Sequence, residues 1–473
     1  MTVYSLTLRA EQADALRTHL VRDDGCERAA YLLCRVAEAG MDPWDRQAHT
    51  KFLVRAVAPV PDTDVIESTP TRVTWSTRSF VKALKEAERT GQIVAVVHNH
   101  PAGFPDFSPQ DDANERDLIQ GAINRNGPGT RLLSVIMTPD GRLTGRVWRH
   151  PSKTGHDPLA MIRVVGGRLD LHYPERGTAA DMRAFHRQAL AFGAALNQDL
   201  RKLRVGIVGC GGTGSAVAML LARLGVGQVL LIDNDIVDQT NLNRLHGARQ
   251  ADADAMRPKV DVVARAITEL GLGVRVVPID AWVGDPACRD ALKCCDIVFG
   301  CTDDHDGRAF INRFAYYYLT PVIDIGLAID VSDAPVPAIN ALDGRVTVLM
   351  PRHTCLMCRE VIDPKIAADQ ALKRKYPAEY EKRKAEAYVF GEGNPSPAVV
   401  TFTTELACMG VNELIHRLQG FRGEDGHAAN RVRIFHLNED RRPGRSPQSY
   451  CPVCGTDENW GMGDVEPFMG RVD

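Results

Sequence analysis

The chain lacks the long apolar segments that membrane-spanning and exported proteins carry. No stretch of about 18 apolar residues occurs, because glycine or charged residues interrupt every apolar region. The N-terminus, "MTVYSLTLRAEQADALRTHL", has no basic segment followed by an apolar run, which is the pattern of a signal peptide. We therefore expect a cytoplasmic protein without a membrane partner.

The chain also lacks an excess of charge of one sign, internal repeats and low-complexity tracts. Its 57 Lys and Arg residues nearly balance its 60 Asp and Glu residues, which gives a net charge of -3. Nucleic-acid-binding domains usually present a strongly basic surface, so no nucleic-acid partner is expected. With 473 residues, of which 44% are hydrophobic, the chain is long enough for two to four folded domains at roughly 150 residues each.

The order of predicted strands and helices indicates an α/β fold class with two domains. Residues 1–150 mix strands such as "GQIVAVVHNH" with helices such as "TRSFVKALKEAERT", which predicts a first α/β domain. Residues 151–178 are rich in Pro, Gly and charge and predict a connector. Residues 179–473 contain the series strand, glycine turn, helix, strand ("RVGIVG", "SAVAMLLARLG", "QVLLIDND"), which begins a doubly wound parallel sheet of the Rossmann type.

The stretch "HNHPAGFPDFSPQDD" contains a predicted metal site. His98 and His100 face the same side at the end of a strand, because side chains two residues apart share a face. Asp111 follows a turn and can supply an oxygen ligand. Two imidazoles and a carboxylate leave one tetrahedral position for water, which is the pattern of a catalytic rather than a structural zinc. A general base is still needed to take a proton from that water.

These residues resemble the signature of the JAMM (MPN/JAB) metalloproteases, in which H-x-H-P and S-x-x-D follow a distant Glu. The resemblance implies that His98, His100 and Asp111 hold zinc and that Ser108 stabilises the oxyanion. It also implies that Glu27, in "CERAAYLLCRV", bonds to the zinc water and acts as the base. Ala30 stands where the family often has Gly, a departure that affects packing more than chemistry.

A second constellation begins with "GCGGTG", in which glycines recur after a strand and before a helix. Glycine lets the backbone approach a phosphate, and the start of a helix favours the negative charge. Asp233 ends the next strand, where an acid can accept hydrogen bonds from ribose hydroxyls. By itself this pattern also fits a dinucleotide enzyme. The glycines predicted to bind the nucleotide are Gly209, Gly211, Gly212 and Gly214.

Residues further along the chain favour nucleotidyl transfer over hydride transfer. Arg244 and Lys259 can stabilise charge on the α-phosphate and on pyrophosphate, and Asp303 can hold magnesium. The run resembles the ThiF/MoeB-like enzymes that activate ubiquitin-like proteins. That resemblance implies that ATP and Mg²⁺ are used, that Asp233 binds ribose, and that Asn241, Arg244 and Lys259 contact phosphates. Arg244, Lys259 and Asp303 are therefore the predicted catalytic residues of this half.

The same resemblance bears on assembly and on a second metal. It implies a homodimer in which Arg187, in "RQALAFG", reaches the ATP of the partner subunit. Two C-x-x-C pairs supply four thiolates, which fit a closed tetrahedral zinc site with a structural role. Redox pairing and simple burial are the alternatives. The paired cysteines are Cys355, Cys358, Cys451 and Cys454.

Together the two halves predict a bifunctional enzyme. The first half would trim or remove a ubiquitin-like protein, and the second would adenylate the C-terminal carboxylate of that protein. A conjugating enzyme is a further expected partner, and similar bacterial fusions include antiphage modification systems. No cysteine lies between Cys358 and Cys408 to accept a thioester. This absence keeps open a second hypothesis, a sulfur-carrier activator in cofactor or amino-acid biosynthesis, and a third is a non-catalytic adaptor.

Overall fold

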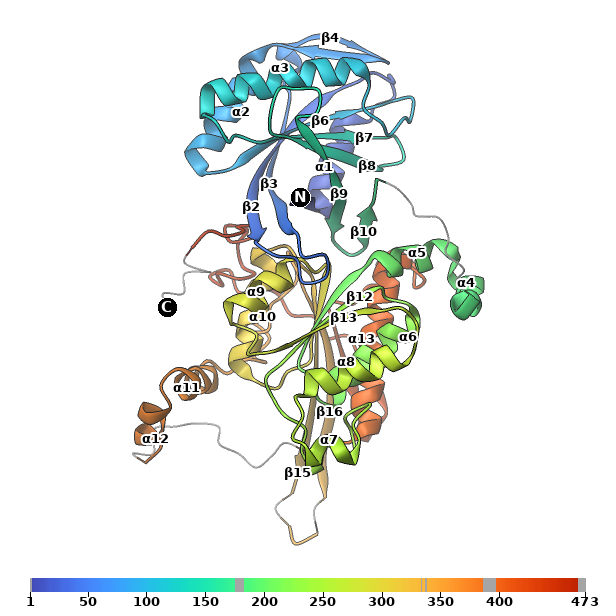
Figure 1. The fold of residues 1–473 in the computed structure, drawn as a ribbon, viewed down its shortest axis with the longest axis vertical. Coiled ribbons are helices and arrows are strands. Elements are labelled where there is room, and N and C mark those ends of the chain that lie inside the picture. Colours follow the sequence, from blue (N-terminus) through green and yellow to red (C-terminus); the bar gives the residue numbers. More distant parts are fainter. Residues whose placement is uncertain (1, 175–182, 333, 337, 386–396, 467–473) are drawn as a thin grey trace.

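The computed structural model describes residues 2–174, 183–332, 334–336, 338–385 and 397–466. Two α/β parts follow one another along the long axis of the molecule, each built around its own sheet (Figure 1). Within the described residues, no helix combines the length and the apolar composition that crossing a membrane requires. The α/β fold class predicted from the sequence is confirmed.

The first sheet has eight strands in the order β1-β3-β2-β6-β7-β8-β9-β10. Because β1 also pairs with β9, the strands from β1 to β9 close into a ring. Strand β2 shows why the sheet is buried on both faces: Leu32 faces a core that includes Leu6, whereas Tyr31 faces a second core that includes Phe80. The strands are β1 (Thr2–Arg9), β2 (Ala29–Ala39), β3 (Ala48–Pro59), β6 (Ile93–Asn99), β7 (Leu132–Met137), β8 (Leu143–Trp148), β9 (His156–Val165) and β10 (Leu169–His172).

Three helices cover this sheet. Helix α1 (Ala10–Leu20) packs on one side, where Leu16 and Leu20 join the core of Leu6. Helices α2 (Thr77–Thr90) and α3 (Pro109–Asn126) lie on the other side, together with the small hairpin of β4 (Val65–Thr69) and β5 (Arg72–Trp75) (Figure 1). The end of β6 and the start of α3 therefore meet at the same place on the sheet.

The segment 151–178 differs from the connector that its composition predicted. Its described part contributes β9 and β10 to the first sheet. Strand β9 is apolar on both faces because Ile162 joins the core of the first sheet while Val165 joins that of the second. In sequence, a strand buried on both faces is a continuous apolar run. Here the Pro and Gly residues around that run led to the prediction of a connector. The predicted boundary at residues 178–179 lies outside the described residues.

The second sheet also has eight strands, in the order β13-β12-β11-β14-β15-β16-β17-β18. The first five are parallel, and their chain order across the sheet is that of a doubly wound nucleotide-binding fold. Ligands in such folds bind at the carboxyl ends of the strands where the order reverses, here beside β11 and β14. The strands are β11 (Arg204–Val208), β12 (Gln228–Asp233), β13 (Arg275–Asp280), β14 (Ile297–Gly300), β15 (Val322–Val331), β16 (Ile339–Leu349), β17 (Asn430–Ile434) and β18 (Glu439–Arg441).

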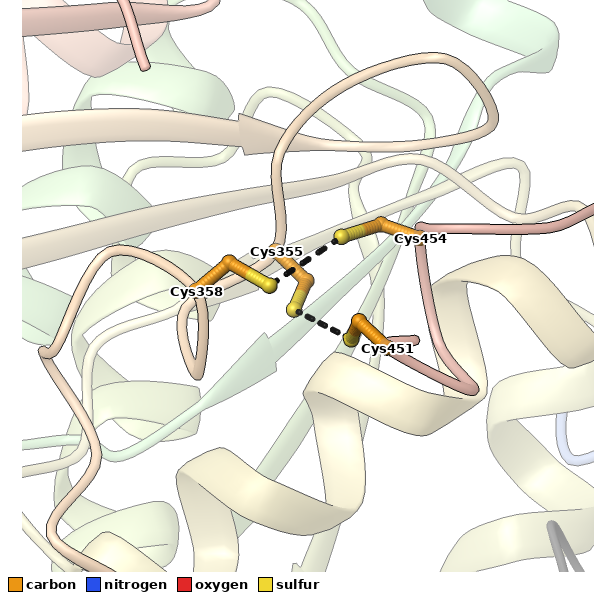
Figure 2. A group of neighbouring side chains, drawn as sticks. All are labelled: Cys355, Cys358, Cys451 and Cys454. Carbon is orange, nitrogen blue, oxygen red and sulfur yellow. Dashed lines mark hydrogen bonds between the residues drawn. The ribbon is translucent and has the colours of Figure 1, made fainter. Parts of the chain in front are cut away.

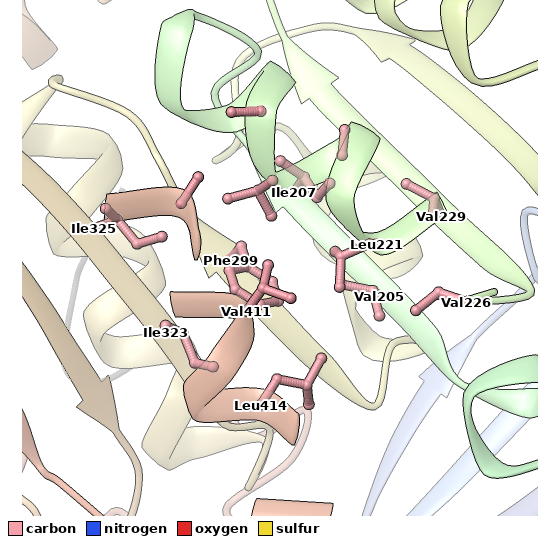
Figure 3. Close-up of a cluster of buried hydrophobic side chains, with 14 of the residues drawn as sticks. Val205, Ile207, Leu221, Val226, Val229, Phe299, Ile323, Ile325, Val411 and Leu414 are labelled. Carbon is pink, nitrogen blue, oxygen red and sulfur yellow. The ribbon is translucent and has the colours of Figure 1, made fainter. Parts of the chain in front are cut away.

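Helices cover both faces of this sheet. On one face Leu221 of α6 and Val411 of α13 pack against Ile207 and Phe299 of the sheet, as Figure 3 shows. On the other face, α9 and α10 join a separate core that includes Val298. The helices are α4 (His186–Phe192), α5 (Ala194–Lys202), α6 (Gly212–Leu224), α7 (Gln250–Asp254), α8 (Lys259–Glu269), α9 (Pro286–Lys293), α10 (His305–Tyr317), α11 (Pro364–Lys375), α12 (Pro377–Ala385) and α13 (Val400–Gln419).

Buried polar contacts join the two parts. The guanidinium of Arg163, on β9, donates to the carboxylate of Asp296, just before β14, with Nη2 2.5 Å from Oδ1. Both side chains are 1% exposed. Lys51, on β3, is also fully buried and donates to the hydroxyl of Thr320 at 2.7 Å. Since isolated charges are costly to bury, these pairs fix how the two parts fit together.

Candidate functional site

The structure brings His98, His100 and Asp111 together at the end of β6. The two Nε2 atoms lie 3.0 Å apart, and the carboxylate oxygens of Asp111 lie 3.3 Å from His98 Nε2 and 3.6 Å from His100 Nε2. Tetrahedral zinc with bonds of about 2.1 Å separates its nitrogen and oxygen ligands by about 3.4 Å. The donor set and its spacing therefore fit a zinc ion.

Neighbouring groups hold two of these ligands in place. Nδ1–H of His100 donates to the carbonyl oxygen of Phe104 at 2.9 Å, which leaves Nε2 with a lone pair for a metal. Asp111 Oδ2 accepts a hydrogen bond from the backbone N–H of Ser108 at 2.7 Å. Burial alone would raise the pKa of Asp111, but its hydrogen bonds with His100 and His98 hold that pKa well below its usual range.

Glu27 lies in the same cavity as these ligands. The cavity has a volume of about 410 Å³, and its lining includes Glu27, His98, His100, Ser108 and Asp111. Burial raises the pKa of Glu27 more than the nearby imidazoles lower it. A carboxylate with a raised pKa is a better proton acceptor, so the position of Glu27 fits the predicted general base.

Ser108 has a clear structural role in addition to its predicted catalytic one. It is the N-cap of α3, and its hydroxyl accepts a hydrogen bond from the backbone N–H of Asp111 at 3.2 Å. Helix α3 is also anchored to β8, because Arg146 donates to Glu115 at 2.7 Å and to Asp112 at 2.6 Å. The cap and this ion pair together fix Asp111 opposite the two histidines.

The glycine turn lines a second cavity of about 620 Å³. Gly209 has φ +91°, and a Cβ at Gly214 would lie 1.8 Å from the carbonyl oxygen of Gly209, so both positions require glycine. A Cβ at Gly211 would meet no heavy atom of the described residues within 4 Å. The space in front of Gly211, at the start of α6, is therefore open to a ligand.

The predicted ribose ligand Asp233 and the predicted phosphate ligand Lys259 line this second cavity. Asp233 ends β12, and its carboxylate accepts hydrogen bonds from the backbone N–H groups of Cys210 at 2.5 Å and Asp235 at 2.8 Å. Burial raises the pKa of Asp233, although Lys259 opposes the shift. Burial would lower the pKa of Lys259, but the carboxylates of Asp233 and Asp235 raise it. Lys259 therefore stays charged in the wall of this cavity.

Two further predicted residues line this cavity and two do not. The side chain of Arg244 packs over Gly212, where a Cβ would lie 3.3 Å from Arg244 Cγ, and Asp303 is exposed at the cavity wall. Asn241 is 7% exposed, and its Oδ1 accepts a hydrogen bond from the Asp238 N–H at 3.2 Å. Arg187 is exposed on α4. Among the described residues, neither Asn241 nor Arg187 lines the cavity.

The structure adds cavity residues that the sequence patterns did not indicate. Arg308, on α10, lies 3.8 Å from the buried carboxylate of Asp324 and faces the cavity. Trp282, after β13, and Arg374, on α11, also line it. In the sequence, Trp282 stands out only by following a predicted strand, and Arg374 only by lying in a basic segment. Both features are too common to identify a site residue.

Four cysteines form a third group of potential ligands, shown in Figure 2. All are buried free thiols, and the Sγ distances are 3.7 Å for Cys355–Cys451 and 3.6 Å for Cys358–Cys454. Zinc–sulfur bonds of about 2.3 Å place tetrahedral sulfurs about 3.8 Å apart. A hydrogen bond with Cys454 lowers the pKa of Cys355 to about 5. The arrangement fits a closed site for a soft cation such as zinc.

Comparison with family models matches both parts of the chain. The model of the ThiF family matches residues 185–454, and the model described as prokaryotic homologs of the JAB domain matches residues 9–150. The first match includes the glycine turn, Lys259 and Asp303, and the second includes Glu27 and Asp111. The two matched ranges correspond to the two sheets of the fold.

Curated relatives include adenylyltransferases and an activating enzyme. The molybdopterin-synthase adenylyltransferase of Salmonella typhimurium is 31% identical over 38% of this chain and 68% of its own length. The SAMP-activating enzyme E1 of Haloferax volcanii is 28% identical over 33% of this chain and 52% of its own length. The sulfur carrier protein ThiS adenylyltransferase of Escherichia coli is 34% identical over 30% of this chain and 57% of its own length. The chain thus spans about half to two thirds of these relatives.

Among solved structures, E. coli MccB with ATP aligns with a TM-score of 0.44 and 18% identity, covering 60% of this chain and 77% of MccB. MccB in complex with N-formylated MccA aligns with a TM-score of 0.44 and 20% identity, covering 58% of this chain and 76% of that chain.

Proposed function

Because this chain belongs to the ThiF family and carries a JAB-like domain in front of it, we propose that it is a bifunctional enzyme acting on a ubiquitin-like protein. The second half adenylates the C-terminal carboxylate of that protein with ATP. The observation that carries this proposal is the convergence of the open glycine turn, Arg244, Lys259 and Asp303 on one cavity. A binding module has no need of two cations and an acid around a phosphate site.

In the adenylation step the carboxylate of the partner attacks the α-phosphate, and pyrophosphate leaves. Lys259 and Arg244 supply positive charge. This charge stabilises the phosphates as negative charge moves onto the leaving pyrophosphate. The backbone N–H groups at the start of α6 donate hydrogen bonds to phosphate oxygens in front of Gly211. Asp233 orients the ribose. Magnesium, when held by Asp303, supplies further neutralisation of the phosphates.

In the first half, we assign hydrolysis of the bond that follows the tail of the ubiquitin-like protein. His98, His100 and Asp111 hold zinc, which supplies polarisation of the scissile carbonyl when bound. Glu27 takes a proton from the attacking water, and its raised pKa suits that role. Ser108 donates to the developing oxyanion. Such a site either trims a precursor of the modifier or removes the modifier from a target.

The proposal also includes a structural metal site and a dimer. The four cysteines hold a second zinc with a structural role, supported by their burial and spacing. We further propose a homodimer in which Arg187 reaches the partner subunit's ATP, which fits its exposed position on α4 outside its own cavity. A conjugating enzyme as downstream partner and a role in antiphage modification complete the proposal.

A second candidate function is activation of a sulfur carrier. It is favoured because no cysteine lies between Cys358 and Cys408 to accept a thioester from the adenylate. Cys408 itself is half-buried on α13, which does not suit that role. The relatives named molybdopterin-synthase adenylyltransferase and ThiS adenylyltransferase point the same way. Mass spectrometry of the partner after reaction distinguishes the two, since a thiocarboxylate supports sulfur transfer and a lysine conjugate supports modification.

Adenylation is tested by ATP–pyrophosphate exchange in the presence of a ubiquitin-like protein that has a free C-terminal carboxylate. Asp303→Ala is expected to lower the exchange rate by about a hundredfold or more, because the acid that holds magnesium is lost. Asp280→Ala, which removes an exposed acid at the end of β13, is the matched control and should leave exchange unchanged. Partner-dependent exchange that survives Asp303→Ala would contradict the assigned site.

A further inference from the structure

Helix α11 forms part of the wall of the nucleotide cavity, although it follows the first cysteine pair in the chain. Its residues Gln370, Lys373 and Arg374 line the cavity. Figure 1 shows α11 beside α10, the helix that follows the predicted magnesium ligand Asp303. The contacts between these two helices therefore bear directly on the geometry of the site.

Side chains tie the start of α10 to the N-cap and the middle of α11. The Oε1 atom of Gln370 accepts hydrogen bonds from the backbone N–H groups of His305 at 2.8 Å and Asp306 at 3.2 Å. The first N–H groups of a helix have no partner within the helix, so a side chain from α11 satisfies two of them. In return, Nδ1 of His305 accepts the N–H of Asp363, the N-cap of α11, at 2.9 Å.

Arg374 extends this connection across the cavity wall. Its guanidinium carbon lies 3.3 Å from the ring centroid of Trp282, and its Nη2 forms an ion pair with Asp306. The indole Nε1 of Trp282 donates to Asp304 Oδ2 at 3.1 Å. Asp304 caps α10 by accepting the N–H of Gly307 at 2.9 Å. A continuous series of contacts thus runs from Arg374 to the residue next to Asp303.

We propose that Arg374 is a positioning residue for ATP. By stacking on Trp282 and pairing with Asp306, it holds α11 as a wall of the cavity and fixes the loop that carries Asp303. This inference rests on the proposed adenylation function, because it takes ATP to be the occupant of the cavity. The cysteine cluster also bears on the cavity. Helix α11 begins shortly after Cys358, so the cluster holds the N-terminal end of this helix in place.

The test is the affinity of the full chain for Mg·ATP, measured by calorimetry without any protein partner. Arg374→Ala is expected to weaken binding about tenfold, the effect of losing a partly buried cation–π contact and its ion pair. Arg374→Lys should recover only part of the affinity, because an ammonium retains the charge beside Asp306 but not the planar stack. ATP should also change tryptophan fluorescence in the parent, and this change should be lost in Trp282→Phe.

Arg383→Ala is the matched control. Arg383 lies on α12, is 51% exposed and pairs only within its own helix with Glu379, at 3.2 Å, among the described contacts. It should bind Mg·ATP like the parent. Equal affinity of Arg374→Ala and the parent would overturn the inference and leave the proposed function standing. A parent chain that binds no ATP would overturn the proposed function itself. If Arg374→Ala does not fold, Arg374→Lys provides the same comparison.

Discussion

A His98→Ala chain is expected to bind one zinc ion where the parent chain binds two, and to lose hydrolytic activity. His98 Nε2 lies 3.0 Å from His100 Nε2 and 3.3 Å from an oxygen of Asp111, so it is close to both other ligands. Its removal leaves an imidazole and a carboxylate, which are too few ligands for a tight zinc site. The four cysteines lie in the other half and should keep their zinc.

The measurement is the zinc content of purified chains, combined with the rate of cleavage of a ubiquitin-like protein extended at its C-terminus. We expect the rate to fall about a thousandfold or more, because both the metal and its polarisation of the carbonyl are lost. His150→Ala removes an exposed histidine from the same domain and should change neither quantity. Unchanged zinc content or unchanged cleavage in His98→Ala would contradict the metal site.

Arg163→Ala is expected to lower the free energy of unfolding by about 3–5 kcal/mol. The change leaves the carboxylate of Asp296 buried without its ion-pair partner, and an uncompensated buried charge carries a penalty of this size. One hydrogen bond remains, from the backbone N–H of Arg204 to Asp296 Oδ2 at 2.8 Å. Since Arg163 and Asp296 belong to different halves of the chain, the loss should weaken the junction between the two halves first.

Chemical denaturation of the full chain measures this effect. Arg149→Ala is the matched control, because Arg149 pairs with Asp157 at the surface, where the two side chains are 43% and 38% exposed. Surface pairs contribute about 0–1 kcal/mol, so this variant should unfold almost like the parent. If Arg163→Ala were no less stable than Arg149→Ala, the buried pair would not hold the halves together.

The sequence predicted the parts of the sites that lie close together along the chain. His98, His100 and Asp111 occupy one strand end and the following helix start, so their spacing alone indicated a common site. The glycine turn and Asp233 likewise fall on consecutive elements of a doubly wound sheet, where the fold places both at the same edge. The expected resemblance to JAB-like and ThiF-like domains is confirmed by the family comparisons. The identity of the metals remains a prediction.

Other parts depend on contacts between distant segments, for which a single sequence carries no local signal. Trp282 and Arg374 meet only because α11 folds back onto the start of α10, and each residue alone looks ordinary. Strand β9 was missed because its apolar residues serve two cores at once, and β10 because it has only four residues. Asn241 fell in the expected segment, but its side chain turns to its own backbone turn rather than to the cavity.

The central claim is that both cavities act on the same protein tail. The most direct measurement uses a ubiquitin-like protein with a short C-terminal extension as substrate for ATP–pyrophosphate exchange. We predict that the parent chain supports exchange with both the extended and the trimmed protein, whereas His98→Ala supports it only with the trimmed protein. Exchange by His98→Ala with the extended protein at the rate of the parent would contradict the claim.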